Sequence, residues 1–160
     1  MKKLSMLILL LCCSTFLLSQ EVSNFSKTEQ SIIVVIEQET DGFWERDFNK
    51  WSDTWSHSDM VSWSGTTNEY HQELNGWKDL SAFVKKSFKD YPSMNTSPVK
   101  RMNWKFQINK NMAWVRFDQD SDVVTSEIRI LEKKGGKWKL VHVGWINESS
   151  FDEALAEGEE

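Results

Sequence analysis

The sequence has 160 residues, a formal net charge of −5, and 27% charged and 39% apolar residues. This length fits one ordinary domain and excludes a large multidomain enzyme. Only seven glycines and two prolines are present, which excludes a collagen-like or linker-dominated chain, and the many large apolar residues argue against a wholly disordered one. Nine tryptophans indicate a globular domain with an aromatic interior, because each ring carries a large apolar area that must be buried or bind a ligand.

The first 19 residues have the pattern of a secretory signal peptide. A short basic start at residues 1–3 precedes an almost wholly apolar or small run at residues 4–18. This run is short for a transmembrane span, which needs about 20 apolar residues. We expect cleavage after Ser19, a small residue, and therefore export to the periplasm or the medium. A lipoprotein anchored through Cys12 or Cys13 is the less favoured alternative, since a bulky leucine precedes Cys12.

Removal of residues 1–19 leaves 141 residues with a net charge of −7 and no cysteine. The mature chain therefore has no disulfide framework, cysteine nucleophile or thiolate metal site. Its acidity disfavours nucleic acid as a partner, because phosphate binding rests on clustered lysine and arginine. Three scattered histidines lack metal-ligand spacing, and the chain has no phosphate-binding glycine loop or serine elbow motif. We expect no metal and no cofactor.

The first part of the mature chain has helical periodicity. Residues 20–27 are predicted to form a flexible start, in which Ser26 and Glu29 have the spacing of a capping box. A helix is predicted to follow, with a second helix over residues 49–56. A spacing of i, i+4, i+7 and i+11 places four aromatic residues on one helical face, either as a core stripe or as the lining of a ligand cavity: Trp44, Phe48, Trp51 and Trp55.

The second part has strand periodicity. Two short strands are predicted over residues 60–64 and 69–74, followed by a turn and a third helix from Trp77 to Phe88. Alternation of apolar and polar residues then predicts a meander of long antiparallel strands, over residues 101–108, 112–118, 125–132 and 138–147. Helices first and strands later indicate the α+β class. Residues 149–160 form an acidic tail.

This order of elements resembles the nuclear transport factor 2-like superfamily, which includes SnoaL-like and ketosteroid-isomerase-like proteins. The resemblance covers residues 28–148 and is carried by five segments: residues 47–48, 59–63, 74–80, 111–115 and 136–143. It implies a cone-shaped α+β barrel with three N-terminal helices packed on a curved antiparallel sheet. It also implies a deep apolar pocket at the wide end of the cone, often within a homodimer formed through the sheet.

The candidate catalytic residues lie on the meander. Ketosteroid-isomerase-like members carry a carboxylate base near the end of the first strand, but residues 61–65 contain no acid here, which disfavours that mechanism. His142 could act as a general base near neutral pH, or be a structural histidine. Alternation places it on one face with Trp138, Leu140 and Ile146.

The candidate ligand-binding residues are mainly aromatic. Trp114, Arg116 and Asp118 are predicted to share a strand face, where Arg116 could bind an anionic group or pair with Asp118, and Asp118 is a second candidate acid or base. The rings expected to line a pocket are those of Trp44, Trp55, Trp63, Trp104 and Trp114.

Three functions are consistent with these observations. The favoured one is an exported module that binds a small apolar or aromatic molecule in a tryptophan-lined pocket. The alternatives are a cofactor-independent isomerase, cyclase or dehydratase using His142 or Asp118, and a dimeric interaction domain whose cone is filled by its own side chains. An enzyme needs an open pocket with a titratable group, a binder needs only the pocket, and a filled cone supports only the interaction role.

Overall fold

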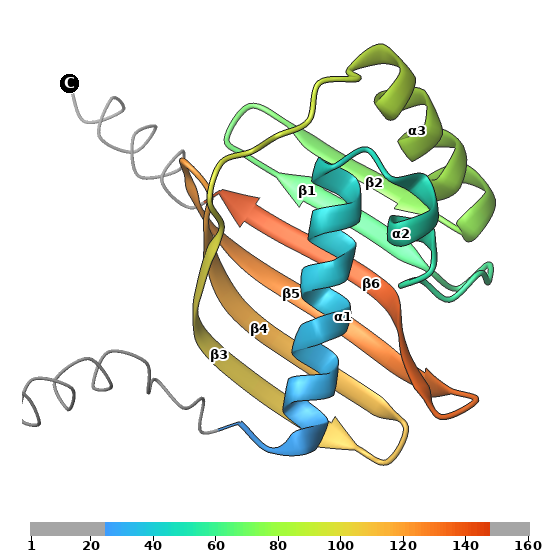
Figure 1. The fold of residues 1–160 in the computed structure, drawn as a ribbon, viewed down its shortest axis with the longest axis vertical. Coiled ribbons are helices and arrows are strands. Elements are labelled where there is room, and N and C mark those ends of the chain that lie inside the picture. The colour runs from blue at the N-terminus through green and yellow to red at the C-terminus, as the bar shows by residue number, and fades with distance from the viewer. Residues whose placement is uncertain (1–24, 148–160) are drawn as a thin grey trace, which may run out of the picture.

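The computed structural model describes residues 25–147, in which three helices lie on one face of a six-stranded sheet (Figure 1). The helices are α1 (Lys27–Trp44), α2 (Phe48–Ser52) and α3 (Trp77–Asp90). The strands are β1 (Ser62–Thr66), β2 (His71–Asn75), β3 (Lys100–Asn109), β4 (Met112–Asp120), β5 (Val124–Lys134) and β6 (Lys137–Asn147). The expected signal peptide, most of the flexible start and the acidic tail lie outside the described residues. Within the described range, no helix has the length and apolar character needed to cross a membrane.

Helix α1 begins at the capping box that the sequence predicts. The Oγ of Ser26 accepts a hydrogen bond from the backbone N–H of Glu29 at 3.3 Å, and the Glu29 carboxylate accepts one from the Ser26 N–H at 2.7 Å. The helix ends at Trp44, and Arg46 adopts a left-handed φ of 61°. The chain therefore turns before α2, which Asp47 caps by accepting hydrogen bonds from two backbone N–H groups of that helix.

The prediction that four aromatic residues share one continuous helical face is wrong. Trp44 ends α1, whereas Phe48 and Trp51 belong to α2. Trp55 lies beyond α2 and forms a parallel bridge to β6. A β-carbon added at Gly42 would lie only 2.5 Å from the backbone nitrogen of Trp51, so this glycine permits close packing of α1 against α2 rather than simply weakening a longer helix.

The sheet has the strand order β2-β1-β6-β5-β4-β3, with β2 and β3 at its open edges. The antiparallel meander from β3 to β6 is confirmed, as are the two short strands, each displaced by about two residues from the predicted range. The prediction of a wholly antiparallel sheet needs correction, because β1 runs parallel to β6. Hydrophobic alternation marks a strand but not its partner, and these two strands are separated by most of the domain.

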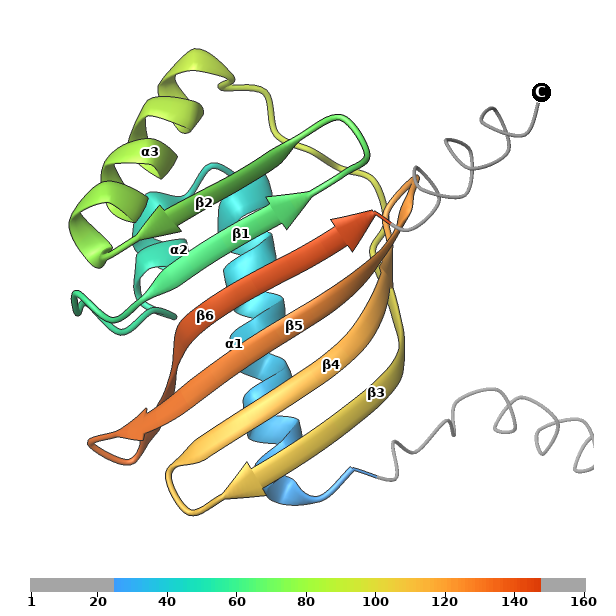
Figure 2. The same cartoon turned by 180° about the vertical axis from the view of Figure 1, so that it is seen from behind.

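The three helices cover one face of the curved sheet, called here the inner face (Figures 1 and 2). On the opposite, outer face no helix of residues 25–147 covers the strands, as Figure 2 shows. Along β4, inward-facing and outward-facing side chains alternate strictly. Val115 and Phe117 are buried on the inner face, while Trp114 and Arg116 are exposed on the outer face.

A β-bulge in β6 changes which side chains face inward. Ile130 of β5 pairs with His142 and the next residue, Leu131, pairs with Leu140, so Val141 is an extra residue on β6. Leu140 is therefore buried in the core, and His142 points to the outer face beside β1. The prediction that these two residues share one face is wrong, because strict alternation fails at the bulge.

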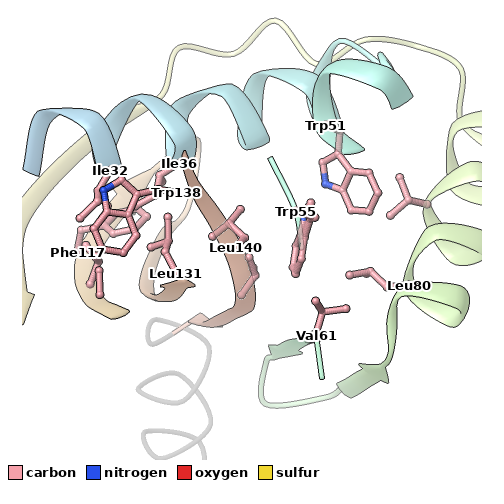
Figure 3. Close-up of a cluster of buried hydrophobic side chains, with 14 residues drawn as sticks. Ile32, Ile36, Trp51, Trp55, Val61, Leu80, Phe117, Leu131, Trp138 and Leu140 are labelled. Carbon is pink, nitrogen blue, oxygen red and sulfur yellow. The ribbon is translucent and has the colours of Figure 1, made fainter. Parts of the chain in front are cut away.

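The core fills one end of the space between α1 and the sheet (Figure 3). Ile32 and Ile36 of α1 pack there over the inner faces of β4, β5 and β6. Trp51 and Trp55 extend this core toward α3 and β1, with ring centroids 5.7 Å apart. The buried apolar side chains are contiguous and form one cluster.

Candidate ligand-binding cavity

A cavity of about 600 Å³ opens between α1, α3 and the inner face of the sheet, at the end that the core does not fill. This inner cavity lies at the ends of β4 and β6 and the start of β5. Its apolar wall is largely aromatic and includes Phe43, Trp44, Trp63, Phe83, Tyr91 and Trp145. The volume is within the range of about 300–1,000 Å³ that is common for small-molecule sites.

Two features of β1 and β6 shape the aromatic wall. The indole of Trp145 lies directly over Gly65, the residue it pairs with on β1, and a β-carbon at Gly65 would lie 2.5 Å from that ring. Glycine at this position therefore lets the Trp145 ring lie flat against the sheet. Trp145 also contacts Trp63 edge-on, with ring centroids 6.2 Å apart.

The cavity has a buried polar base. Its members come from α1, β4 and β5 and are Glu39, Thr40, Gln119, Thr125, Glu127 and Arg129. Arg129 is 4% exposed, and its Nη1 donates hydrogen bonds to Glu127 at 2.6 Å and to the Gly144 carbonyl at 3.3 Å. The hydroxyl of Thr125 donates to the other oxygen of Glu127 at 2.6 Å. These contacts fix the pair on the inner face of β5.

Glu39 approaches the same base from α1. Its side chain is 6% exposed, and its Oε1 accepts a hydrogen bond from the Trp51 indole N–H at 3.0 Å. Burial raises the pKa of this carboxyl group, although the positive charge of Arg129 and the bond from Trp51 oppose the shift. The base of the cavity thus combines an ion pair with a carboxyl group whose pKa is raised.

The structure divides the sequence-predicted ligand residues between different environments. Trp44 and Trp63 line the inner cavity. Trp55 is buried in the core and is not among the cavity residues, while Trp104 stacks on Phe117 with centroids 4.4 Å apart. Trp114 lies on the outer face, half exposed. The six ligand-binding candidates, with Arg116 also outside, do not form one site.

The remaining candidates meet in a second depression, the outer groove, on the opposite face of the sheet. It is lined by Ser64, Thr66, Arg116, Asp118, Ile128 and His142, among others. Asp118 accepts hydrogen bonds from Asn103 at 2.6 Å and from Ser126 at 3.5 Å. Within residues 25–147 no ion pair joins Arg116 to Asp118.

His142 occupies the part of the outer groove nearest β1. Its Nδ1 lies 2.8 Å from the Ser62 hydroxyl, and its ring covers Gly144, where an added β-carbon would lie 2.8 Å from Nε2. Burial lowers the pKa of His142, the positive charge of Arg129 lowers it further, and Glu73 opposes both. The neutral imidazole is therefore the favoured form on this face.

Sequence reasoning missed the polar base, although two signals were available. Glu39 continues the apolar stripe of Ile32, Ile36 and Phe43 on α1, so an acid stands where the periodicity expects an apolar residue. On β5, Glu127 and Arg129 alternate with isoleucines, and a half-buried strand would ordinarily direct the isoleucines inward. The structure directs the charges inward instead. Such a departure from the binary pattern is typical of functional sites.

Within residues 25–147 no group of three or more histidine, cysteine, aspartate or glutamate side chains is placed to hold a metal ion. Two residues of the polar base, Glu39 and Glu127, carry carboxyl groups. The positive charge of Arg129 interacts with both of them. The arrangement is suited to hydrogen bonding.

No family model matches the sequence, and no curated protein matches it. Solved structures do. A calcium/calmodulin-dependent kinase II association domain candidate from Thiobacillus denitrificans has a TM-score of 0.59 at 10% identity, covering 72% of this chain and 93% of that one. A candidate ketosteroid isomerase from Parabacteroides distasonis has a TM-score of 0.59 at 13% identity, covering 81% and 93%.

A nuclear transport factor 2-like protein of unknown function from Silicibacter pomeroyi has a TM-score of 0.57 at 10% identity, covering 76% of this chain and 98% of that one. The chain therefore has the nuclear transport factor 2-like fold, and the predicted α+β class and cone-shaped architecture are confirmed, with an open, mixed sheet in place of a closed antiparallel one. These identities establish the fold alone, because one fold supports many unrelated functions.

Proposed function

We propose that this protein binds a small molecule with an aromatic or apolar body in the inner cavity. The observation that supports this proposal best is the cavity itself, in which an aromatic wall surrounds a buried polar base at one end of the cone. A cone filled by its own side chains would have no such space. Aromatic walls with a few polar groups at fixed positions are the usual composition of small-molecule sites.

The proposal is tested on the mature protein by native mass spectrometry for a co-purifying ligand, followed by a small-molecule screen monitored by tryptophan emission. We expect a bound apolar or aromatic molecule to change that emission, since Trp44, Trp63 and Trp145 line the cavity. A screen in which no aromatic or apolar molecule binds would remove this function.

A variant that fills the cavity tests whether the ligand binds there. Ser87 on α3 lines the cavity, whereas Ser81 on the same helix does not. Ser87→Phe should weaken ligand binding and Ser81→Phe should not. Equal effects of the two substitutions would mean that the ligand binds elsewhere.

A second candidate function is self-association through the outer face. Met112, Trp114 and Ile146 project from this face, and the Trp114 side chain is 50% exposed. Large exposed apolar side chains on an uncovered sheet favour burial against a second copy of the chain. Light scattering should give a dimer mass that Trp114→Lys converts to a monomer mass. A monomer at every concentration would contradict this candidate.

A third candidate, a cofactor-independent enzyme, rests on the outer groove, which brings His142 and Asp118 into one depression with Arg116. If a reaction is found and His142→Ala leaves its turnover unchanged, His142 has no catalytic role in it. In each of the three candidates, the predicted signal peptide would place the activity outside the cytoplasm, and N-terminal sequencing of the mature protein tests that expectation.

A further inference from the structure

The polar base of the inner cavity contains hydrogen-bond donors that the chain does not use. Arg129 is almost fully buried, and its Nε has no hydrogen-bond partner among residues 25–147. Its hydrogen bonds to Glu127 and to two backbone carbonyls all come from Nη1. An unpaired buried donor on a charged group is costly, so an occupant of the cavity that offers an acceptor to the Arg129 guanidinium would lower this cost.

Glu39 adds a second polar group with spare capacity. Its Oε1 is engaged by Trp51, while its Oε2 has no hydrogen-bond partner among the described residues. In the neutral form favoured by burial, this carboxyl group carries a proton that it can donate. Glu39 and Arg129 both line the cavity, so an acceptor placed at its base can meet donors from α1 and from β5.

The charge at the base also favours an anion. Glu127 and Arg129 neutralise one another. Arg101 on β3 contributes a further positive charge near Glu39, and its Nη2 is likewise buried without a partner in the described part of the chain. With Glu39 neutral, these four groups carry one positive charge more than negative, and the carboxylates of Glu37 and Asp41 also act on Arg101 from α1.

We propose that the base of the inner cavity binds the carboxylate of an aromatic or apolar acid, with Arg129 and the Glu39 carboxyl group donating hydrogen bonds to it. The acid's ring system would lie against the aromatic wall, where Trp63 and Trp145 meet edge-on. This inference rests on the proposed binding function and names its ligand class. An organic cation is the competing ligand class, because it would pair with an ionised Glu39.

Three matched probes separate these classes by titration calorimetry and tryptophan emission: 2-naphthylacetate, 2-(2-naphthyl)ethanol and 2-(2-naphthyl)ethylamine. At a pH where Glu39 is neutral, the acid should bind at least about tenfold more tightly than the alcohol, as charge-assisted hydrogen bonds imply. Its affinity should fall as the pH rises and Glu39 ionises beside Glu127, Arg129 and Arg101. A cationic ligand would bind more tightly over the same pH rise.

Variants locate the effect. Glu39→Gln keeps a neutral donor and should retain the preference for the acid while removing its pH dependence. Glu69→Gln, at an exposed glutamate between β1 and β2 that does not contribute to the shift of Glu39, should leave both unchanged. The double substitution Glu127→Gln with Arg129→Gln removes the ion pair without leaving one charge buried alone, and should abolish the preference for the acid while the alcohol still binds. The double substitution Lys86→Gln with Asp90→Asn, which removes an exposed ion pair of α3 and likewise leaves the net charge unchanged, serves as its control.

Arg46 is the alternative cation within the cavity. Its guanidinium is held at the rim by the backbone carbonyls of Phe43 and Tyr91, at 2.8 and 2.9 Å. If Arg46→Gln, and not the double variant, abolishes the preference, the assignment to the base is overturned. If the alcohol binds as tightly as the acid, or the amine binds most tightly, the inference fails while the proposed binding function stands. If none of the three probes binds, the inference fails, and the proposed binding function fails with it only when the wider screen also finds no aromatic or apolar ligand.

Discussion

The inner and outer faces of the sheet are formed by the same strands but differ in burial and in the kinds of side chain they carry. The inner face combines a packed core at one end with a cavity of buried charges at the other. The outer face is uncovered by helices in the described residues and carries Trp114, Arg116, Asp118 and His142 at the surface. Neighbouring residues of one strand thus differ in burial and chemistry. Side-chain identity alone is a poor guide to the site, and the face on which a side chain lies is decisive.

The largest contrast should come from removing a tryptophan on each side. Trp51 is fully buried, stacks on Trp77 with centroids 5.6 Å apart and donates to Glu39. Trp51→Ala should lower the free energy of unfolding by about 3–5 kcal/mol. Trp114→Ala should change it by less than about 1 kcal/mol in the monomer, as for other surface positions. Urea unfolding at low protein concentration measures both, and equal losses would contradict the contrast.

A methyl group added at two glycines should give a smaller difference of the same kind. In Gly65→Ala the new β-carbon meets the ring of Trp145, which contacts Trp63 edge-on in the aromatic wall, so we expect a loss of about 1–3 kcal/mol and an altered tryptophan emission. In Gly144→Ala it meets the Nε2 edge of the His142 ring at 2.8 Å and the Ser64 hydroxyl at 3.3 Å, both on the outer face, where these side chains can shift outward. Thermal unfolding should therefore show a larger decrease in Tm for Gly65→Ala than for Gly144→Ala. The reverse order would contradict the tighter packing assigned to the inner face at Gly65.

The pH dependence of stability should identify Glu39 as an inner-face group. Its pKa is raised above the ordinary 4.5, so the folded state binds the proton more tightly than the unfolded state does. The resulting stability is fully present below pH 4.5 and is lost as the pH rises through the folded-state pKa. Glu39→Gln should flatten that decline, measured by urea unfolding from pH 4 to pH 9. Glu69→Gln, at an exposed glutamate that does not contribute to the shift of Glu39, should not, and a decline of unchanged slope in Glu39→Gln would contradict the assigned shift.

The smallest expected effect concerns His142 on the outer face. Its pKa is lowered below the ordinary 6.5, so the unfolded state binds the proton more tightly. The corresponding stability is present above pH 6.5 and is lost as the pH falls toward the folded-state pKa. His142→Gln should reduce the loss of stability between pH 7 and pH 5, whereas His71→Gln, at an exposed histidine bonded to Thr66, should leave it unchanged. If the parent protein, His142→Gln and His71→Gln all lost the same stability between pH 7 and pH 5, the acid-dependent loss could not be assigned to His142.

Much of the fold could be predicted from the sequence. The capping box at Ser26 and Glu29 marked the start of α1, and strict alternation gave the long strands to within a few residues. These signals are local, so a single sequence carries them in full. The break between α1 and α2 was missed, because it depends on a left-handed Arg46 and on the packing of Gly42 against Trp51.

The candidate site was predicted less well, for a physical reason that His142 illustrates. The spacing of β6 assigned it to the same face as Leu140, and one extra residue at Val141 reversed that assignment. Glu127 and Arg129 were overlooked because charged residues that alternate with isoleucines ordinarily face water. Their burial is tolerated only because each partners the other and Thr125 completes the network.

The sequence by itself determined the class of the protein and the order of its elements, because capping, periodicity and turn residues act over a few neighbours. It also determined that nine aromatic indoles must find an apolar environment. Only the tertiary structure decided which of them pack the core, which line a cavity and which remain outside. That outcome depends on one bulge, on two close approaches at glycine and on a parallel pairing of β1 with β6. The β1–β6 pairing and the contact of Gly65 with Trp145 join residues far apart in the chain. The bulge in β6 and the contact of Gly42 with Trp51 depend on how neighbouring elements pack, which a local pattern does not reveal.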